Sequence, residues 1–354
     1  MRIVFYSNRI FFDGDYLTKR GLGGSESALI NLSTSWKKEH SADEIIVYNG
    51  RVRTNENSNF EGVAYKTVLD FKAECRTFNA DVFITLREPD PLMEPYIDSK
   101  LFLFHSQDDM NEPGLQTIKS NLYLQKRIDS ILAISEHSKK DFINNLPIPV
   151  KIIRNGYNHE WIPKEFKKGN GIAVYTSTPF RGLDVLTQCW PEIYNECKLQ
   201  DITPTLKIFS GMSLYQQPDD PSLMILYNVL RNLSGVIFSN PLPQKELFKE
   251  LQSANVMLYP NHFLETGCMA VTEALANGCW VVTSNLGALP EQVEDQKNGF
   301  LIDGDAHTQE YKKKFIEAAV CALCYIPIPN SESLIFTWKN QMEELRNYIY
   351  KLLR

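Results

Sequence analysis

Two glutamates, Glu265 and Glu273, stand eight positions apart, and the short turn Thr266-Gly267-Cys268 directly follows the first. Strong helix formers come next, so Glu265 is expected just before a helix and Glu273 farther along it. The first amides of that helix are predicted to be those of Gly267 and Cys268. Because the first N–H groups of a helix lack partners within it and carry partial positive charge, they suit an anion such as a phosphate.

The spacing also suggests the length of a ligand. The six steps from Gly267 to Glu273 correspond to about 9 Å of helix rise. One group of a ligand could therefore bind at the helix tip while Glu273 reaches a second group farther along. A sugar joined through a diphosphate to a nucleoside has this length and polarity.

Arg181 is a second candidate for binding phosphate. It lies in the loop 177–182, between an expected strand at 171–176 and an expected helix with apolar residues at Leu183, Leu186, Trp190 and Ile193. A guanidinium can hold a diphosphate through two parallel hydrogen bonds. Considered singly, Arg181 fits a surface arginine, and each glutamate fits a loop acid or a helix ion-pair partner. Three such residues at matching strand ends favour a binding site.

A glycine-rich turn near the amino terminus also joins a strand to a helix. Gly23 and Gly24 would let backbone approach a ligand closely, and Ser25 is expected to cap the helix. The nicotinamide fingerprint requires a third glycine and an acidic residue after the second strand. Here the third glycine is missing and the second strand ends at Asn49-Gly50, which disfavours a dehydrogenase.

The elements that must position these residues follow from short apolar runs alternating with helical or loop segments. We expect an α/β fold of two Rossmann-like, doubly wound domains, at 1–160 and 161–337. The runs stand at 2–7, 44–48, 81–85, 100–105 and 130–135 in the first half, and at 171–176, 206–210, 235–239, 256–259, 280–283 and 300–302 in the second. In such sheets ligands bind beyond the carboxyl ends of the strands, where His105 falls. On position alone, a structural role for His105 is as well supported as a functional one.

Composition excludes several classes of protein. The 354 residues are 43% hydrophobic and 23% charged with a net charge of −6, which disfavours a nucleic-acid binder. The first apolar run is too short for a secretory signal, and no run approaches the ~20 residues of a membrane span.

Seven scattered cysteines predict reduced thiols and a cytoplasmic protein. The pair Cys321 and Cys324 lies on an expected apolar helix face, which favours core packing over zinc or redox chemistry.

Taken together, these segments resemble family 4 glycosyltransferases, which are retaining, nucleotide-sugar-dependent enzymes of the GT-B fold, with two such domains facing across a cleft. The resemblance covers nearly the whole chain. It rests on Gly23-Gly24-Ser25-Glu26, on Arg181 to Leu186, on the Glu-x7-Glu motif from Glu265 to Glu273, and on Ala274 to Gly278 and Asn298 to Leu301. Each segment alone is unspecific, whereas their combination in this order is specific.

The resemblance implies a role for each candidate residue. Gly23 and Gly24 would face the donor diphosphate and Arg181 would neutralise it. Glu265 would bind hydroxyls of the transferred sugar, Glu273 would bind the ribose hydroxyls, and His105 matches the histidine near the reacting centre. The turn Thr266-Gly267-Cys268 would line the donor pocket, with the amides of Gly267 and Cys268 bound to sugar or phosphate oxygens.

Two departures from the family pattern stand out. The family has a second basic residue shortly before the Arg-Gly pair, where this chain has Tyr175-Thr176-Ser177-Thr178. Diphosphate binding would then depend more on Arg181 and the helix tip, or on a lysine such as Lys245. The family's Gly-Phe-Gly after the first glutamate is here Thr266-Gly267-Cys268, which changes the pocket wall.

The expected reaction is retaining transfer of a hexose from a nucleoside diphosphate sugar to a hydroxyl of a saccharide or glycoconjugate. Uridine is the expected base, and this expectation rests on the resemblance to the family alone. Neither a cofactor nor a metal is expected to be required. One alternative is a metal-dependent GT-A transferase that holds manganese through Asp108 and Asp109. Another is a catalytically silent nucleotide-sugar-binding subunit, which the missing second base motivates.

The carboxyl-terminal stretch reads as a helix over about 338–354. The resemblance implies that this helix packs back on the first domain, and any membrane contact through it is expected to be peripheral. Acceptor contacts are expected in the first half, where the candidates at loops are Arg9, Phe11, Phe12, Asp13, Arg87, Glu88 and Asp90.

Overall fold

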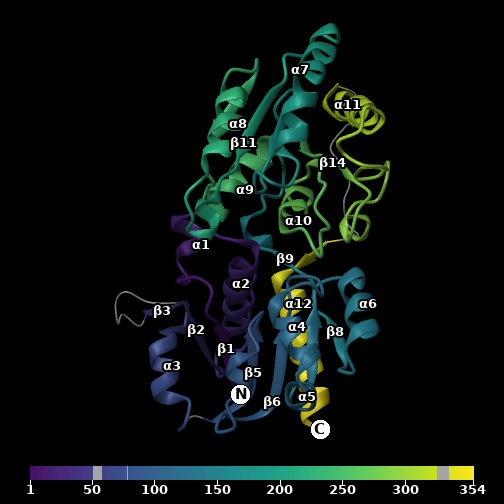
Figure 1. Ribbon diagram of the computed structural model, residues 1–354. Helices are drawn as coiled ribbons and strands as arrows, with labels where there is room; N and C mark the ends of the chain where they lie inside the picture. Colours follow the sequence, from purple (N-terminus) through teal and green to yellow (C-terminus); the bar gives the residue numbers. More distant parts are fainter. Residues whose placement is uncertain (51–57, 78, 325–334) are drawn as a thin grey trace. The chain divides into compact units, whose positions relative to one another are not determined.

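The computed structural model of the protein describes residues 1–50, 58–77, 79–324 and 335–354. Within these ranges the chain forms two compact units, which Figure 1 colours by sequence. Unit 1 consists of Met1–Tyr16, Gly24–Gly156 and Phe336–Arg354. Unit 2 consists of Leu17–Gly23 and Tyr157–Ile335. The expected division at 160 to 161 therefore lies four residues beyond the observed one, and the segment Leu17–Gly23 belongs to unit 2 despite its place in the chain.

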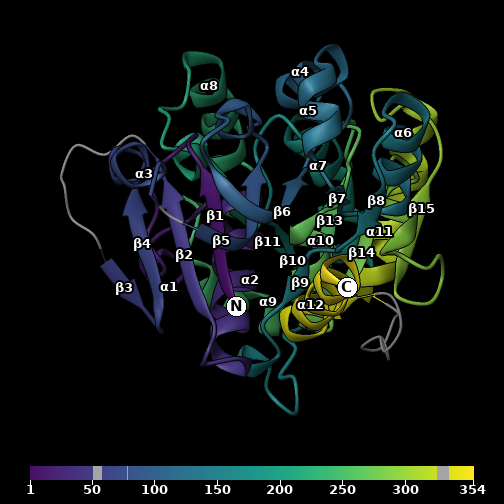
Figure 2. The same ribbon diagram turned by 90° about the horizontal axis from the view of Figure 1, so that it is seen from below.

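Unit 1 is built on an eight-stranded sheet in the order β3-β4-β2-β1-β5-β6-β7-β8. Its strands are β1 (Arg2–Ser7), β2 (Glu44–Asn49), β3 (Ser58–Phe60), β4 (Val63–Thr67), β5 (Asn79–Leu86), β6 (Asp98–His105), β7 (Ser130–Ala133) and β8 (Val150–Ile152). All pairs are parallel except β3 with β4, and Figure 2 shows β3, β4, β2 and β1 side by side. The order reverses between β1 and β5, which makes their carboxyl ends the switch point of unit 1.

The helices of unit 1 connect these strands. They are α2 (Gly24–Glu39), α3 (Val68–Glu74), η1 (Asp90–Met93), α4 (Pro113–Ser120), α5 (Leu122–Arg127), α6 (Glu136–Asn145) and α12 (Trp338–Leu353). Ser135 caps α6 by accepting from the Ser138 amide, as expected. Ser25 does not cap α2, since the helix already begins at Gly24 and Ser25 lies inside its first turn.

The carboxyl-terminal helix α12, yellow in Figure 1, packs on α2 and β6 of unit 1. Its buried face presents Trp338, Met342, Leu345 and Ile349, which recur at the three- and four-residue spacing of a helix stripe. Arg154 donates its backbone N–H to Gln341 Oε1 at 2.6 Å, and His40 Nε2 lies 2.8 Å from Glu343 Oε1. The last helix thus completes the core of the first unit.

Unit 2 contains a six-stranded, fully parallel sheet in the order β12-β11-β10-β13-β14-β15. The strands are β10 (Ile172–Tyr175), β11 (Thr205–Phe209), β12 (Val236–Ser239), β13 (Val256–Tyr259), β14 (Trp280–Ser284) and β15 (Gly299–Ile302). Counted along the chain this is the 3-2-1-4-5-6 order of the Rossmann fold. The inner strands read as unbroken apolar runs because parallel strands are covered on both faces.

Helices connect the strands of unit 2 as well. They are α7 (Leu183–Leu199), η3 (Met212–Tyr215), α8 (Pro221–Arg231), α9 (Gln244–Ser253), α10 (Met269–Ala276), η4 (Leu289–Glu291) and α11 (Gln309–Cys324). The predicted stripe of α7, from Leu183 through Leu186 and Trp190 to Ile193, is fully buried. Helix α11 packs on α7 and carries Cys321 and Cys324 as free, partly buried thiols.

Short elements lie near the points where the chain passes between the units. These are α1 (Tyr16–Lys19), η2 (His159–Trp161), and a two-stranded sheet of β9 (Gly156–Tyr157) and β16 (Phe336–Thr337). Among the described residues, no helix combines the length and the hydropathy needed to cross a bilayer.

Candidate functional site

Two of the predicted residues meet at the switch point of unit 2. Strands β10 and β13 are neighbours in the sheet, although the chain makes β11 and β12 between them. Arg181 lies in the loop after β10, and Glu265 lies in the loop after β13. Both therefore stand beyond carboxyl ends of strands, where ligands of open α/β sheets bind.

Arg181 and Glu265 form an ion pair. Arg181 Nη1 lies 2.8 Å from Glu265 Oε1, and the Tyr259 hydroxyl donates to the same oxygen at 2.5 Å. The Glu265 side chain is 3% exposed and that of Arg181 24%, so water reaches the arginine more readily than the carboxylate. Burial has the largest single effect on the Arg181 pKa and lowers it, but the Glu265 carboxylate and the other groups around the guanidinium together raise that pKa above its usual range. Arg181 therefore keeps its positive charge beyond the carboxyl ends of β10 and β13, where the Glu265 carboxylate balances it.

Aromatic rings flank the guanidinium. Arg181 lies over the Phe263 ring at 4.5 Å and over the Phe180 ring at 5.7 Å. The two rings meet edge to face with centroids 6.5 Å apart, and both side chains are more than 40% exposed. Rings on a guanidinium restrict its orientation while its free edge stays in water.

Two glycines allow the site loops to pack closely. Gly182 has a φ of 102°, and a Cβ there would lie 2.1 Å from the Pro260 carbonyl oxygen. Gly287 has a φ of 60°, and a Cβ there would lie 2.3 Å from the Glu265 carbonyl oxygen. No L side chain fits either position, so glycine is what sets the distance between the arginine loop and the glutamate loop.

The start of α10 differs from the prediction. Helix α10 begins at Met269 with Cys268 at the N-cap, so Gly267 precedes the cap. The Cys268 amide donates to Gln292 Oε1 at 3.0 Å, and Gln292 Nε2 donates back to the Cys268 carbonyl at 2.9 Å. The expectation that the Cys268 amide is open to a ligand is therefore wrong in this structure, because a side chain already accepts from it. Burial raises the pKa of the Cys268 thiol, which keeps the thiol neutral.

Thr266 and Gly267 lie between Glu265 and the N-cap. Thr266 is buried and Gly267 is partly exposed. Gly267 is thus the more accessible part of the predicted turn.

Glu273 lies within α10 and is buried against α9. Gln244 Nε2 donates to Glu273 Oε1, and both side chains are nearly inaccessible. Burial raises the pKa of Glu273 to about 7, against the lowering effect of the Gln244 hydrogen bond. The carboxyl group is therefore poised between its two protonation states near neutral pH. Lys245, suggested as a substitute base, follows Gln244 on α9 with its side chain exposed.

Several polar atoms beside Arg181 lack a hydrogen-bond partner. In the part of the chain that the structure describes, these include Thr176 Oγ1, Thr178 Oγ1 and Arg181 Nε, all buried. Unpaired buried polar atoms are costly, and their clustering beyond β10 marks this loop as incompletely satisfied. The segment that lacks the family's second base is thus rich in hydroxyls.

The predicted Gly-Gly pair is divided between the two units. Gly24 is exposed at the first position of α2 in unit 1. Gly23 belongs to unit 2, where its amide donates to the Leu214 carbonyl at 3.1 Å. The Gly23 N–H is therefore occupied within the protein.

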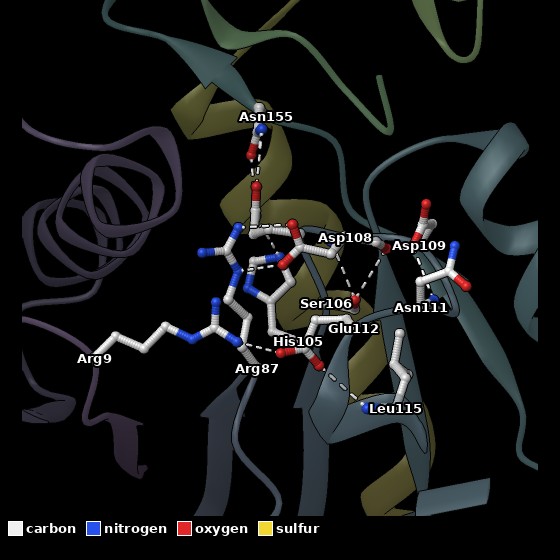
Figure 3. A network of polar contacts seen from close by, with 11 residues as sticks. Arg9, Arg87, His105, Ser106, Asp108, Asp109, Asn111, Glu112, Leu115 and Asn155 are labelled. Atoms are coloured by element: carbon white, nitrogen blue, oxygen red, sulfur yellow. Dashed lines mark hydrogen bonds and ion pairs between the residues drawn. The ribbon is translucent and has the colours of Figure 1, made fainter. Parts of the chain in front are cut away.

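His105 ends β6 in unit 1 and is buried in the polar network of Figure 3. Its Nε2 lies 3.0 Å from Gln107 Nε2, and Gln107 in turn pairs with Asn155 through contacts of 3.1 and 3.3 Å. An amide nitrogen can only donate, so Nε2 accepts and the ring proton is on Nδ1. Burial, with a contribution from Arg87, lowers the pKa of His105 to about 4. The imidazole is neutral at physiological pH.

Two arginines of unit 1 are held by acids in the same network. Arg87 Nε lies 2.6 Å from Asp108 Oδ2, and Arg9 pairs with Glu112, which also caps α4 (Figure 3). Asp108 is thus committed to Arg87, which argues against the manganese role weighed for Asp108 and Asp109. Asp109 Oδ1 accepts from the Asn111 amide at 2.9 Å in a local turn.

The acceptor candidates of unit 1 differ in accessibility. Phe12 is fully buried, so it is wrong as an acceptor contact. Glu88 accepts from the Asn8 amide at 2.6 Å, which joins the loops after β5 and β1 at the switch point of unit 1.

Several residues that shape unit 2 were not predicted. Tyr259 binds Glu265, Gln244 binds Glu273 and Gln292 binds the α10 N-cap. Tyr259 could have been inferred because it ends an expected strand. The two glutamines carry no sequence signal, since their partners are set by helix packing.

Known proteins resemble the chain in sequence. Residues 218–320 match the family described as Glycosyl transferases group 1, and this range contains Glu265 and Glu273. An uncharacterized glycosyltransferase of Methanocaldococcus jannaschii is 24% identical over 195 residues, covering 55% of this chain and 51% of that protein. The chain thus spans about half the length of this curated relative.

Solved structures match over the full length. Sucrose-phosphate synthase from Thermosynechococcus elongatus gives a TM-score of 0.71 at 14% identity, with 99% of each chain covered. Anabaena HepE in complex with UDP and glucose gives 0.67 at 15% identity, with 99% of this chain and 100% of that one covered. The chain has the GT-B fold. The sheet order of unit 2 and the pairing of Arg181 with Glu265 are therefore features of a GT-B protein.

Proposed function

We propose that the protein is a retaining glycosyltransferase that moves a hexose from a nucleoside diphosphate sugar, with uridine as the base, to a hydroxyl of a saccharide or glycoconjugate. The observation that carries the proposal is the Arg181–Glu265 pair at the switch point of unit 2. The match of residues 218–320 to a glycosyltransferase family supports the reaction class. The UDP and glucose in the HepE structure support a uridine donor.

Arg181 and Glu265 exchange partners when the donor binds. The diphosphate takes the guanidinium, whose charge offsets the negative charge that develops on the leaving group. Glu265, released from the arginine, accepts hydrogen bonds from sugar hydroxyls, while Tyr259 continues to hold the carboxylate. Thr266 and the Gly267 amide complete the donor contacts of unit 2, and Gly23 shapes the turn.

Glu273 binds the ribose. A carboxylate accepts both hydroxyls of a ribose diol, one through each oxygen. The donor therefore binds the ionised form of Glu273, and Gln244 orients that side chain.

The transfer proceeds without a protein nucleophile. The acceptor hydroxyl attacks the face from which the diphosphate departs, an oxocarbenium-like state is passed, and the departing phosphate takes the acceptor proton. The chain supplies positioning and electrostatic stabilisation. With a pKa of about 4, His105 is too weak a base to take that proton at neutral pH, so its role is that of a neutral hydrogen-bonding group. No cofactor or metal is assigned a step.

The test uses purified full-length protein with uridine, guanosine and adenosine diphosphate sugars. Release of the nucleoside diphosphate reports hydrolysis or transfer, and NMR of the product reports its anomeric configuration. A uridine donor with retention is the expected result. Inversion at the anomeric carbon, or activity with another base only, would contradict the corresponding part of the proposal.

The alternative function is a nucleotide-sugar-binding subunit without catalysis. The occupied Gly23 amide and the absence of a base at 175–178 favour it. Such a subunit binds donor, as seen by thermal shift, yet releases no nucleoside diphosphate with any acceptor. Any turnover that is abolished by Arg181→Ala excludes it.

A further inference from the structure

Three potential metal ligands converge on the surface of unit 2, outside the donor contacts assigned above. They are Asp184, His262 and His307, whose candidate ligand atoms all lie within 4.8 Å of one another. Asp184 stands in the first turn of α7, His262 in the loop after β13, and His307 in the segment between β15 and α11. Residues far apart in sequence thus bring two imidazoles and one carboxylate together.

The spacing of the atoms suits a transition metal ion. His262 Nε2 lies 3.3 Å from Asp184 Oδ1, and His307 Nδ1 lies 3.8 Å from Asp184 Oδ2. A tetrahedral zinc ion with bonds of about 2.0–2.1 Å places its ligands about 3.3 Å apart. The two histidine rings are 4.8 Å apart between centroids, so small rotations of the side chains bring all three donors to one ion.

The backbone around both histidines is already fixed. Asn261 Oδ1 accepts from the Phe263 amide at 2.9 Å, and the Asn261 side chain is buried, which anchors the residues on both sides of His262. Asp305 Oδ1 accepts from the His307 amide at 2.9 Å, and the Thr308 hydroxyl donates to the Asp305 carbonyl at 2.8 Å. Only side-chain rotamers remain to be ordered when an ion binds, which lowers the entropic cost of binding.

The side chains are accessible as well as anchored. The exposed fractions are 31% for His262, 40% for Asp184 and 51% for His307. An ion can therefore reach all three and keep a water molecule as a fourth ligand, as zinc does when three protein ligands bind it. The chemistry of the set is selective, because imidazole favours zinc, nickel and copper, whereas magnesium prefers oxygen ligands.

We propose that Asp184, His262 and His307 form a binding site for a divalent transition metal ion such as Zn²⁺. The ion links the start of α7, the loop after β13 and the segment before α11. His262 is three residues from Glu265, and Asp184 is three residues from Arg181. Binding therefore stiffens the two loops that present the ion pair, independently of which donor the protein takes.

The experiment titrates Zn²⁺ and Co²⁺ into purified full-length protein at pH 7.5, with Mg²⁺ in parallel. Zinc is expected to raise the melting temperature of the protein, and Co²⁺ to give the visible absorption of a site with nitrogen ligands. Mg²⁺ at equal concentration is expected to produce no shift. Neither readout depends on enzymatic activity.

The variants His307→Gln and Asp184→Asn test the ligand set, and His159→Gln, at an exposed position outside the cluster, is the matched control. Each ligand variant is expected to weaken Zn²⁺ binding at least tenfold, while the control binds as the wild type does. A metal-free melting temperature equal to wild type shows that a variant is folded. Unchanged Zn²⁺ affinity in both ligand variants, or equal loss in the His159 control, overturns the proposal and leaves Asp184 as a polar neighbour of the two histidines.

Discussion

Arg181 and Glu265 depend on each other for more than ligand binding. The Glu265 carboxylate is almost fully buried, and its partners at one oxygen are the guanidinium and the Tyr259 hydroxyl. Removing one member of a buried ion pair leaves an uncompensated charge, at a cost of about 3–5 kcal/mol. Loss of activity in Arg181→Ala would therefore combine an effect on catalysis with an effect on stability.

The variant Arg181→Lys separates these effects. Lysine keeps the charge that compensates Glu265, but it lacks the planar fork that binds a diphosphate through two parallel bonds. We expect near wild-type stability and a fall in kcat of about 10- to 100-fold, and a fall of 100- to 1,000-fold for Arg181→Ala. Nucleoside diphosphate release and urea unfolding are the measurements.

Arg231→Ala is the control for those variants. Arg231 is also in unit 2 and also lies over an aromatic ring, that of Phe238 at 4.8 Å, but it is far along α8 from the switch point. Its replacement is expected to leave turnover unchanged. Equal losses in Arg231→Ala and Arg181→Ala would mean that the activity depends on general stability and not on the ion pair.

Glu273 predicts a pH dependence of donor affinity. In the free protein burial raises the pKa of Glu273 to about 7. Under the proposed function, the ribose binds the ionised carboxylate. Below pH 7 the protein must lose a proton in order to bind, so the Kd for a UDP-sugar rises toward tenfold per pH unit as pH falls. Calorimetry at pH 6 and pH 8 measures it, since the diphosphate diester of the donor does not titrate in that range.

The variant Glu273→Gln removes the titrating group. It is expected to bind the donor more weakly at pH 8 and to show a Kd that hardly changes down to pH 6. A wild-type Kd that is constant across this range would contradict the assigned role of Glu273.

At the residue scale, the sequence predicted positions better than partners. The residue types at strand ends identified Arg181 and Glu265, and the structure brings these two into contact. The sequence could not predict that Gln292 accepts a hydrogen bond from the Cys268 amide or that Gln244 contacts Glu273. Such contacts depend on how neighbouring helices pack, which leaves no local pattern in the chain.

At the scale of elements, Gly182 and Gly287 allow the loops of the site to pack closely. Gly304 serves as the experimental control for Gly182. Gly182 and Gly304 share positive φ values of 102° and 109°, but a Cβ at Gly304 would meet nothing within 4 Å. Gly182→Ala should therefore suffer backbone strain and a clash with the Pro260 carbonyl, whereas Gly304→Ala should suffer strain alone. We expect Gly304→Ala to lose about 1 kcal/mol and Gly182→Ala clearly more.

Urea unfolding followed by fluorescence measures the difference between the two variants. Equal destabilisation would mean that the loop after β13 relaxes away from Gly182. In that case, the close approach of the two loops would not require glycine.

The predicted strands are a further result at this scale. The eleven apolar runs from 2–7 to 300–302 all correspond to strands. Strands β3, β4 and β8 were missed because they are short edge or near-edge strands with polar alternation, such as Ser-Asn-Phe in β3 and Val-Lys-Ile in β8. Buried parallel strands leave a strong apolar signal, whereas edge strands do not.

At the scale of the whole molecule, unit 1 depends on the last segment of the chain. Leu345 is completely buried on α12 in the core that the helix shares with α2. We expect Leu345→Ala to cost about 2–5 kcal/mol in the unfolding of unit 1 and to leave the unfolding of unit 2 unchanged. Differential scanning calorimetry resolves the two transitions, and Lys351→Ala, exposed on the same helix, is the control.

Donor binding should stabilise unit 2 against unfolding. A ligand at 100 times its Kd adds about 2.7 kcal/mol to the state that binds it. A UDP-sugar is therefore expected to raise the unit 2 transition of both wild type and Leu345→Ala. If the Leu345→Ala substitution shifted both transitions equally, the two units would not unfold independently.

Unit 1 is made of segments from both ends of the chain, and this affects the order in which the two units fold during synthesis. A nascent chain releases its amino-terminal residues first, and domains are generally completed in that order. Here the β1–β8 sheet leaves the ribosome without α12, and the residues of unit 2 follow before α12 does. Unit 2 can therefore complete its folding first, while the apolar face of α2 that packs on α12 is still exposed to solvent. In a cell, that interval is when a chaperone would bind the first unit of this protein.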